Sequence, residues 1–323
     1  MSGIIDQNNI CLTNLGRNLD IPTTIKHKIK TADRLIGNKK LHLERRTIYQ
    51  ALSKQLLNTI PNPIIIIDWS PLSSDQEQQL LRAAFALNGK RSIALYEEVH
   101  PVHLLGNRDI QTQFLDRLKY QILPKHIQPI IIADSGFRVP FFKQVETLGW
   151  HWLGRIRNRD FIACTPSNLD DNKPRFFKAK DLYPNATTTP QAIGEILWTK
   201  SSKFEANLFL YHKAAQRRLD KTVKGQRRQD KYSRKHALRE REPWLLVASK
   251  SLDINAQQAV DYYTSRMQVE TGFRDMKSPY YGLGLTDNSR ILPCRYENLL
   301  VIVALASYLL WIIGNGIQGK KNT

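Results

Sequence analysis

The chain has 323 residues, enough for one large domain or two to three smaller ones with a buried core. Lysine and arginine number 48 against 29 aspartate and glutamate, so the formal charge is +19. This excess favours a polyanionic partner, nucleic acid above all, over a membrane surface or a merely soluble basic protein. Three distant cysteines, with no CxxC pair, exclude a disulfide framework and a zinc site and fit a reducing cytoplasm.

Residues 1 to 60 are expected to be helical and basic. The apolar positions from Ile25 to Ile36 keep a helical period and are closed by Gly37-Asn38, and a second helix is predicted from Leu43 to Leu57. This segment is either a small DNA-binding unit or a helical wrapper around the next domain, and the pattern leaves both open. No basic stretch followed by an apolar core begins the chain, so no secretory signal is predicted.

Residues 61 to 160 are expected to alternate strands and helices. The predicted strands are PIIIIDWS, LRAAFAL, SIALYEEVH, PIIIADSGF and HWLGRIR, with helices at 109 to 120 and 139 to 148. Asn88-Gly89 is a strong hairpin signal, so the first three strands are expected to be consecutive and antiparallel. The expected order of the first four strands is third, second, first, fourth.

The texture changes after residue 160. Short strand-like pieces (RFFKA, GEILWTK, ANLFLYHKA) lead to a block at 213 to 241 with 12 Lys or Arg against three acids. That block is a solvated loop, an arm that neutralises phosphates, or both. WLLVASKSL resumes the strand pattern, and a long helix is predicted from Asn255 to Met276. The apolar run at 299 to 313 is shorter than a membrane span and predicts a core helix, so no membrane partner is expected.

Two aspartates occupy equivalent positions in the predicted strands. Asp68 and Asp134 each follow a run of isoleucines at the expected end of a strand, and the first and fourth strands are expected to be neighbours. Glu270, on a helix packed against that sheet, would complete a cluster of three carboxylates. Divalent cations relieve the repulsion of such a cluster, and oxygen-only ligands select Mg²⁺ or Mn²⁺. Two ions about 4 Å apart would support phosphodiester displacement.

The segment YYTSRMQVETGFRDMK places four polar residues on one helical stripe. Tyr263, Arg266, Glu270 and Lys277 fall within about 60° of one another on an ideal helix. A solvated face laced with i,i+4 ion pairs is the alternative to a functional stripe.

These residues carry a resemblance. The spacing Tyr263-x2-Arg266-x3-Glu270-x6-Lys277, with Asp68 in IIDWS and Asp134 in IIADSGF, resembles the YREK-signature DDE transposases of bacterial insertion sequences, the IS four family. The stretches RDMKSPYYGLGL and ADSGFR are similar to its Tn ten-like group. The resemblance extends over nearly the whole chain.

The resemblance implies an α/β fold: a ribonuclease-H-like mixed sheet flanked by helices, interrupted by a β-rich insertion, with a short helical N-terminal segment. The expected segments are a basic DNA-binding segment (1–60), the first part of the catalytic core (61–160), the insertion with its basic arm (161–250) and the core helices with the YREK motif (251–323). The implied activity is cut-and-paste transposition: cleavage at the transposon ends, a hairpin intermediate, and joining of the 3′-OH to target DNA.

The resemblance also implies residue roles. Asp68, Asp134 and Glu270 would be catalytic and would hold two Mg²⁺ ions, for which Mn²⁺ can substitute. Tyr263, Arg266 and Lys277 would contact DNA phosphates. Trp244 would stack on a base flipped out near the hairpin, and its alternative is a core tryptophan on a strand.

The implied partners are double-stranded DNA, as inverted-repeat ends and as target, and a second subunit in a synaptic dimer in a bacterial cytoplasm. Only 53 residues (323 − 270) follow Glu270, and Asp68 comes early, so the chain is expected to be shortened at both ends. This brings end-specific binding and dimerisation into question. A truncated, inactive DNA-binding relic or inhibitor of a full-length transposase is the alternative, although no carboxylate of the triad is missing. A structure-selective nuclease would leave the stripe and Trp244 without a purpose.

Overall fold

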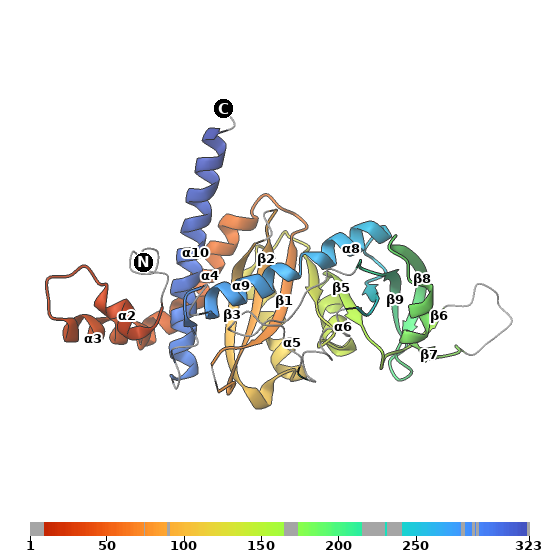
Figure 1. Cartoon of the computed structure of the whole chain (residues 1–323), viewed down its shortest axis with the longest axis horizontal. Coiled ribbons are helices and arrows are strands. Elements are labelled where there is room, and N and C mark those ends of the chain that lie inside the picture. The colour runs from red at the N-terminus through yellow and green to blue at the C-terminus, as the bar shows by residue number, and fades with distance from the viewer. Residues whose placement is uncertain are drawn as a thin grey trace. The chain divides into compact units, whose positions relative to one another are not determined.

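The computed structural model describes residues 10–73, 75–88, 91–164, 174–214, 230, 241–278, 282–285, 288 and 291–321, with side chains through residue 314. The chain divides into two compact units (Figure 1). Unit 1 comprises Met1–Ile132, Lys143–Trp150 and Ser265–Thr323, and unit 2 comprises Ala133–Phe142 and His151–Thr264. The predicted division into four functional segments partitions the chain differently and stays a prediction.

Unit 1 is built on a sheet whose described strands follow the order β3-β2-β1-β4. They are β1 (Ile64–Pro71), β2 (Gln78–Ala86), β3 (Ser92–Pro101) and β4 (Ile130–Ala133). Ile65, Ile66 and Ile67 of β1 are fully buried, which is typical of a β-branched strand covered on both faces. The order and the antiparallel pairing of β1, β2 and β3 confirm the prediction.

Strand β4 runs beside β1 in the parallel sense. The amide of Gln128 donates to Pro61 O at 2.8 Å, and the amide of Ile130 donates to Pro63 O at 3.0 Å. The residue numbers rise together along both segments, as they do in parallel pairs. The protein is therefore α/β with a mixed sheet flanked by helices, as predicted, and consistent with a ribonuclease-H-like fold.

The described part of the N-terminal segment forms three helices, of which the last two begin at side-chain caps. They are α2 (Leu12–Arg17), α3 (Ile25–Ile36) and α4 (Lys39–Leu57). The Thr24 hydroxyl accepts from the third residue of α3, and the bounds of α3 are the predicted ones. The Asn38 side chain accepts from the amides of Lys40 and Leu41. This cap starts α4 four residues before the predicted Leu43.

The two helices expected in the segment from 61 to 160 also match the predicted pattern closely. They are α5 (Arg108–Arg117), which continues as a π-helical turn (Leu118–Ile122), and α6 (Val139–Thr147). Asn107 caps α5 through the amides of Asp109 and Ile110. Phe114 and Leu115 are fully buried, which accounts for the predicted inward face of α5.

The last helix, α10 (Pro293–Lys321), holds the long apolar run of the C-terminal segment. It packs on α4 and β3, and Leu300 is fully buried, as expected of a core helix. Leu310 and Ile313 are 49% and 55% exposed, so the core-helix prediction holds only for the first part. Pro293–Gly314 is long and apolar enough to cross a membrane, a test that core helices also pass, and 44% of its most apolar window is buried.

Unit 2 is rich in strands, and their described order is β5-β10-β9-β8-β6-β7. They are β5 (His151–Ile156), β6 (Phe161–Cys164), β7 (Phe177–Lys178), β8 (Gln191–Trp198), β9 (Phe204–Tyr211) and β10 (Trp244–Ala248), followed by α8 (Ala256–Thr264). The neighbouring strands pair antiparallel. Most of the predicted basic block at 213 to 241 lies outside the described residues.

An aromatic cluster forms the core of unit 2. The ring of Phe142 lies 4.5 Å from that of Trp152 and 5.7 Å from that of Trp198, between ring centroids. Gly154 of β5 allows this packing, because a Cβ there would stand 2.6 Å from Phe142 Cζ. Glycine at position 154 therefore leaves room for the Phe142 ring in the closely packed core.

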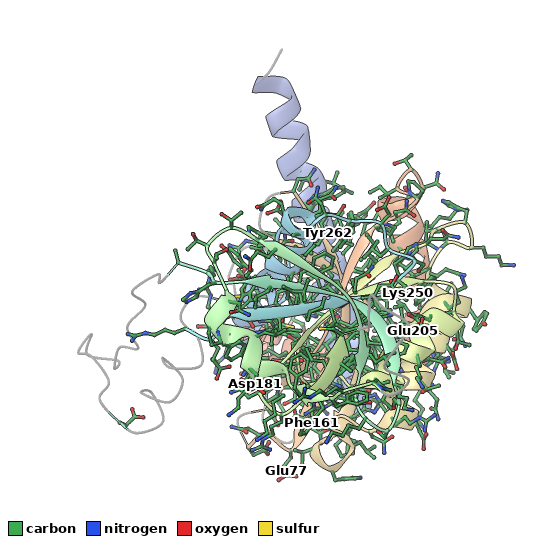
Figure 2. All side chains as sticks on the ribbon, turned by 90° about the vertical axis from the view of Figure 1, so that its right-hand side faces the viewer. Glu77, Phe161, Asp181, Glu205, Lys250 and Tyr262 are labelled. Carbon is green, nitrogen blue, oxygen red and sulfur yellow. The ribbon has the colours of Figure 1, made fainter. Side chains whose placement is uncertain are left out.

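Ion pairs join two strands of unit 2 to the turn after β10 at the surface. Lys250 Nζ lies 3.0 Å from Glu195 of β8 and 3.1 Å from Glu205 of β9, and Figure 2 shows Lys250 beside Glu205. The two carboxylates raise the pKa of Lys250. Exposed pairs of this kind contribute little to stability, so the aromatic core is the main support of the sheet.

The predicted long helix from Asn255 to Met276 is wrong, because the helix is interrupted. It ends as α8 at Thr264 and resumes as α9 (Met267–Lys277) after Ser265 and Arg266. The Thr264 hydroxyl donates to Val260 O at 2.7 Å. Adjacent Thr and Ser residues offer the backbone such local alternatives, which favour a bend or a break.

Candidate active site

Asp68 lies within β1 and not at its end, because the strand continues through Trp69 and Ser70 to Pro71. This corrects the predicted strand-end position, and the residue opposite Asp68 in the register is Arg82 of β2. Asp68 Oδ1 accepts from the Trp69 amide at 2.9 Å, and 13% of the Asp68 side chain is exposed. A carboxylate so buried beside apolar strands requires a positive partner.

Arg266, at the start of α9, supplies that positive charge. Its Nη1 lies 3.3 Å from Asp68 Oδ2, and its Nη2 lies 2.5 Å from Glu270 Oε1. Positions i and i+4 lie on one helical face, so Arg266 and Glu270 point to the same side of α9. One guanidinium thus joins a carboxylate of the sheet to a carboxylate of the helix.

Lys277, at the end of α9, also reaches β1. Its ammonium donates a hydrogen bond to Ser70 Oγ, and Ser70 shares a strand face with Asp68. Burial, and then the charge of Arg82, lower the pKa of Lys277 to about 8 against the attraction of Asp68. Its Nζ also lies 5.0 Å from the centroid of the Phe273 ring. An anion placed beside Lys277 would favour its charged form.

Tyr263 does not share this stripe. It belongs to α8, before the interruption, and to unit 2, whereas Arg266 and Lys277 belong to unit 1. Only 4% of Tyr263 is exposed, and its ring centroid lies 5.1 Å from that of Trp244. The single helix on which the stripe was drawn is therefore wrong, and the DNA contact of Tyr263 stays a prediction.

Asp134 directly follows β4, as predicted, and lies in unit 2. Its Oδ1 accepts from the Gly136 amide at 2.7 Å, and Asp134 O accepts from the Phe137 amide at 3.2 Å. A Cβ on Gly136 would stand 2.9 Å from Asp134 Oδ1, so glycine allows this turn. The proximity of Asp134 to Asp68 stays a prediction.

Trp244 begins β10 and is 8% exposed. Two cations face its ring: Arg155 Cζ lies 5.8 Å from the ring centroid, and Lys213 Nζ lies 5.4 Å from it. Tyr211 and Tyr263 meet the ring edge to face. Base stacking on Trp244 stays a prediction, and it requires a base to take the place of one of these cations.

The carboxylates of the site are candidate metal ligands. No group of three or more His, Cys, Asp or Glu side chains among the described residues is arranged to hold an ion. Asp68 and Glu270 nevertheless present oxygen atoms, the ligands that Mg²⁺ and Mn²⁺ prefer. The guanidinium of Arg266 already places a positive charge between them. The pair therefore suits a divalent cation, provided that Arg266 gives up at least one of its two contacts.

Sequence reasoning missed two polar residues next to this site. Ser70 could have been identified by its position two residues after Asp68 in an alternating strand. Gln268 holds the backbone of Leu87 through both atoms of its carboxamide. No sequence signal marks that contact, because the partner is a main-chain group 181 residues away.

Comparison with known proteins identifies the family of the chain. No curated protein matches the chain. The family described as "Transposase DDE domain" matches residues 61–307, a span of more than half the chain that includes Asp68, Asp134, Arg266, Glu270 and Lys277. The protein belongs to the transposase DDE domain family.

Proposed function

We propose that the protein is the DNA transposase of a bacterial insertion sequence, of the YREK-signature IS four family and Tn ten-like group. It cuts phosphodiester bonds at the ends of its element and joins the released 3′-OH to target DNA. The family implies a DNA substrate. The observation that carries the finer proposal is the bridge from Asp68 through Arg266 to Glu270.

Members of the family generally depend on divalent metal ions. In the proposed site Asp68, Asp134 and Glu270 hold two Mg²⁺ ions, or Mn²⁺ in their place. When bound, the ions supply activation of the attacking oxygen and stabilisation of the leaving one. The contribution of the chain is a set of oxygen ligands fixed on a strand, a turn and a helix.

Arg266 and Lys277 are proposed to hold phosphates of the transposon end. In the structure Arg266 contacts two carboxylates, so its charge is already matched. Once those carboxylates take other partners, the guanidinium can turn to phosphate oxygens, which it binds with charge-assisted hydrogen bonds. Lys277 stands beside Ser70 on the same face and would meet a neighbouring phosphate.

The remaining proposed roles concern the hairpin step, DNA binding and dimer formation. Trp244 is proposed to stack on a flipped base during hairpin formation, and Tyr263 beside it to donate to a phosphate. The charge of +19 supports binding of both end and target DNA. A synaptic homodimer in the bacterial cytoplasm is the proposed working form.

Nicking of DNA that carries the ends of the element tests this proposal. The expected result is cleavage that requires Mg²⁺ or Mn²⁺ and stops in excess EDTA. DNA of scrambled end sequence is the control for end recognition. Cleavage that continues in EDTA would contradict the metal-dependent mechanism.

A further inference from the structure

Helix α9 carries two functional faces, and the second one meets the hairpin between β2 and β3. Gln268 Nε2 donates to Leu87 O at 3.0 Å, and the Leu87 amide donates to Gln268 Oε1 at 3.0 Å. The same Leu87 amide also donates to Arg91 O, the bond that closes the hairpin. The Gln268 carboxamide thus shares the Leu87 N–H with Arg91 O and also donates to the Leu87 carbonyl.

Two further contacts continue this line along α9. Gly272 lies close to the hairpin, because a Cβ on it would stand 3.5 Å from Arg82 Nη1 and 3.6 Å from Ser92 Oγ. Arg91 forms an ion pair with Asp275. Positions 268, 272 and 275 follow the i, i+4, i+7 spacing of a single helical face. We call the contacts made by Gln268 and Asp275, with Gly272 between them on the same face, the hairpin brace.

The opposite side of α9 carries the candidate site. Arg266 contacts Asp68 and Glu270, and Lys277 contacts Ser70, so this side faces β1. Figure 1 shows α9 lying across the strands of unit 1. Because a helix turns as a rigid rod, a contact that fixes one face also fixes the direction of the other.

The first turn of α9 depends on a tertiary contact for its orientation. The interruption at Ser265 and Arg266 separates it from α8, so no continuous helix sets its direction. Gln268 lies in this turn, two residues before Glu270. Its two hydrogen bonds are part-buried, which increases their value over bonds to solvent.

We propose that Gln268 is a positioning residue that sets the place of Glu270 by pinning the first turn of α9 to the β2–β3 hairpin. The inference rests on the proposed role of Glu270 as a metal ligand. Gln268 does not touch the reacting atoms. It acts through the backbone of α9, with Gly272 and the Arg91–Asp275 pair as further parts of the hairpin brace.

Gln268→Met in the full chain tests the inference, because methionine keeps the length of the side chain and removes both hydrogen bonds. Free Mn²⁺ measured by electron paramagnetic resonance gives the metal affinity, and nicking against Mn²⁺ concentration gives a second value. We expect both affinities to fall about tenfold, the effect of losing one or two hydrogen bonds. High Mn²⁺ should restore nicking, and affinity for end DNA without metal should stay unchanged.

Gln257→Met is the matched control. Gln257 donates to Asp261 within α8 and is exposed, so its loss removes a glutamine hydrogen bond that joins no other element. Its metal affinity should equal that of the wild type. A charge exchange supplies a second variant: Arg91→Asp should weaken Mn²⁺ binding, and Asp275→Arg in the same chain should restore it.

The outcomes separate the inference from the proposed function. Wild-type metal affinity in a folded Gln268→Met protein would overturn the positioning role. The positioning role would also be overturned if nicking were lost, high Mn²⁺ did not restore it, and the melting temperature fell in parallel. That result would show that Gln268 acts through stability alone. Full nicking by Glu270→Gln would instead overturn the proposed function itself.

Discussion

Arg266 donates a hydrogen bond to Asp68, a residue 198 positions earlier in the chain, with Nη1 3.3 Å from Oδ2. The same guanidinium contacts Glu270, so one cation joins these two carboxylates. The two carboxylates and the phosphates of DNA therefore compete for the guanidinium of Arg266. This competition leads to the first prediction.

Arg266→Ala should change metal and DNA binding in opposite directions. Without the guanidinium, the two carboxylates lose their internal cation, and Mn²⁺ affinity should rise by about tenfold. Affinity for end DNA should fall by about 1–3 kcal/mol, because a charge-assisted phosphate contact is lost. Mn²⁺ titration without DNA and a gel-shift assay without metal measure the two effects separately.

Arg274→Ala provides the control for Arg266. Arg274 is also on α9, is 65% exposed in its side chain and lies 3.9 Å from Asp275. Its removal should leave Mn²⁺ affinity as it is. Equal effects of the two substitutions, or a fall in metal affinity for Arg266→Ala, would contradict the competition between carboxylates and DNA.

Glu98 should make unit 1 sensitive to acid. Burial would raise the pKa of this carboxyl, but hydrogen bonds from His100, Arg117 and Tyr96 outweigh burial and lower the pKa from 4.5 to about 2. A group with a lowered folded pKa stabilises above its unfolded pKa and loses this contribution as the pH falls through the folded one. Between pH 4.5 and pH 2 the free energy of unfolding should therefore fall by about 3 kcal/mol.

Urea unfolding of the wild type and Glu98→Gln at pH 7 and pH 3 measures this effect. The wild type should be the more stable protein at pH 7, and the gap should shrink by pH 3. A gap that is equal at both values would mean that the Glu98 carboxyl is not held in its charged form.

Two glycines should respond to alanine in opposite ways. A Cβ on Gly154 would stand 2.6 Å from Phe142 Cζ in a closely packed core, so Gly154→Ala should destabilise unit 2 by about 1–3 kcal/mol. Gly272 is within α9, and its Cβ would find ordinary contacts at 3.5 Å and beyond. Gly272→Ala should raise the free energy of unfolding by about 0.5–1 kcal/mol.

Thermal unfolding of both variants checks the pair. A destabilised Gly272→Ala protein would show that α9 lies closer to the hairpin than described. A neutral Gly154→Ala protein would show that the Phe142 ring can move away.

Trp244→Ala should separate nicking from hairpin chemistry. First-strand nicking should stay largely intact, whereas hairpin formation or opening should fall by about 5- to 150-fold, the value of one stacked base. Because Trp244 is 8% exposed, the substitution should also lower the free energy of unfolding by about 3–5 kcal/mol.

Assays at a temperature where circular dichroism shows the Trp244→Ala protein folded keep the two effects apart. Normal hairpin yields from the folded variant would leave Trp244 as a core residue only. Lys213→Ala, which removes one cation over the ring, is the comparison variant and should retain hairpin formation.

Much of unit 1 could be predicted from the sequence because its signals are local. The isoleucine runs of β1 and β4, the Asn88-Gly89 turn and the Gly37-Asn38 stop each act within a few residues. The antiparallel order β3-β2-β1 follows from the short connections, whereas the place of β4 beside β1 was expected from the sheet order. The same local reasoning placed Asp68 at a strand end, which is wrong, since pairing with β2 extends β1 to Pro71.

The site could be predicted only in part, because its contacts are made between distant segments. Periodicity placed Arg266, Glu270 and Lys277 on one helical face, and it added Tyr263 because it cannot detect the helix break at Ser265 and Arg266. The link from Arg266 to Asp68 and the bond from Gln268 to Leu87 depend on tertiary packing. Neither leaves a pattern in the sequence.

Glu270→Gln tests the central claim most directly. The substitution keeps the shape of the side chain and removes the charge that a metal ion needs, so affinity for end DNA should equal that of the wild type. Mg²⁺-dependent nicking of the same DNA should fall by orders of magnitude, as expected when a ligand of the catalytic ions is lost. Nicking by Glu270→Gln at the wild-type rate, with DNA binding intact, would contradict the assignment of this carboxylate and of the active site built around it.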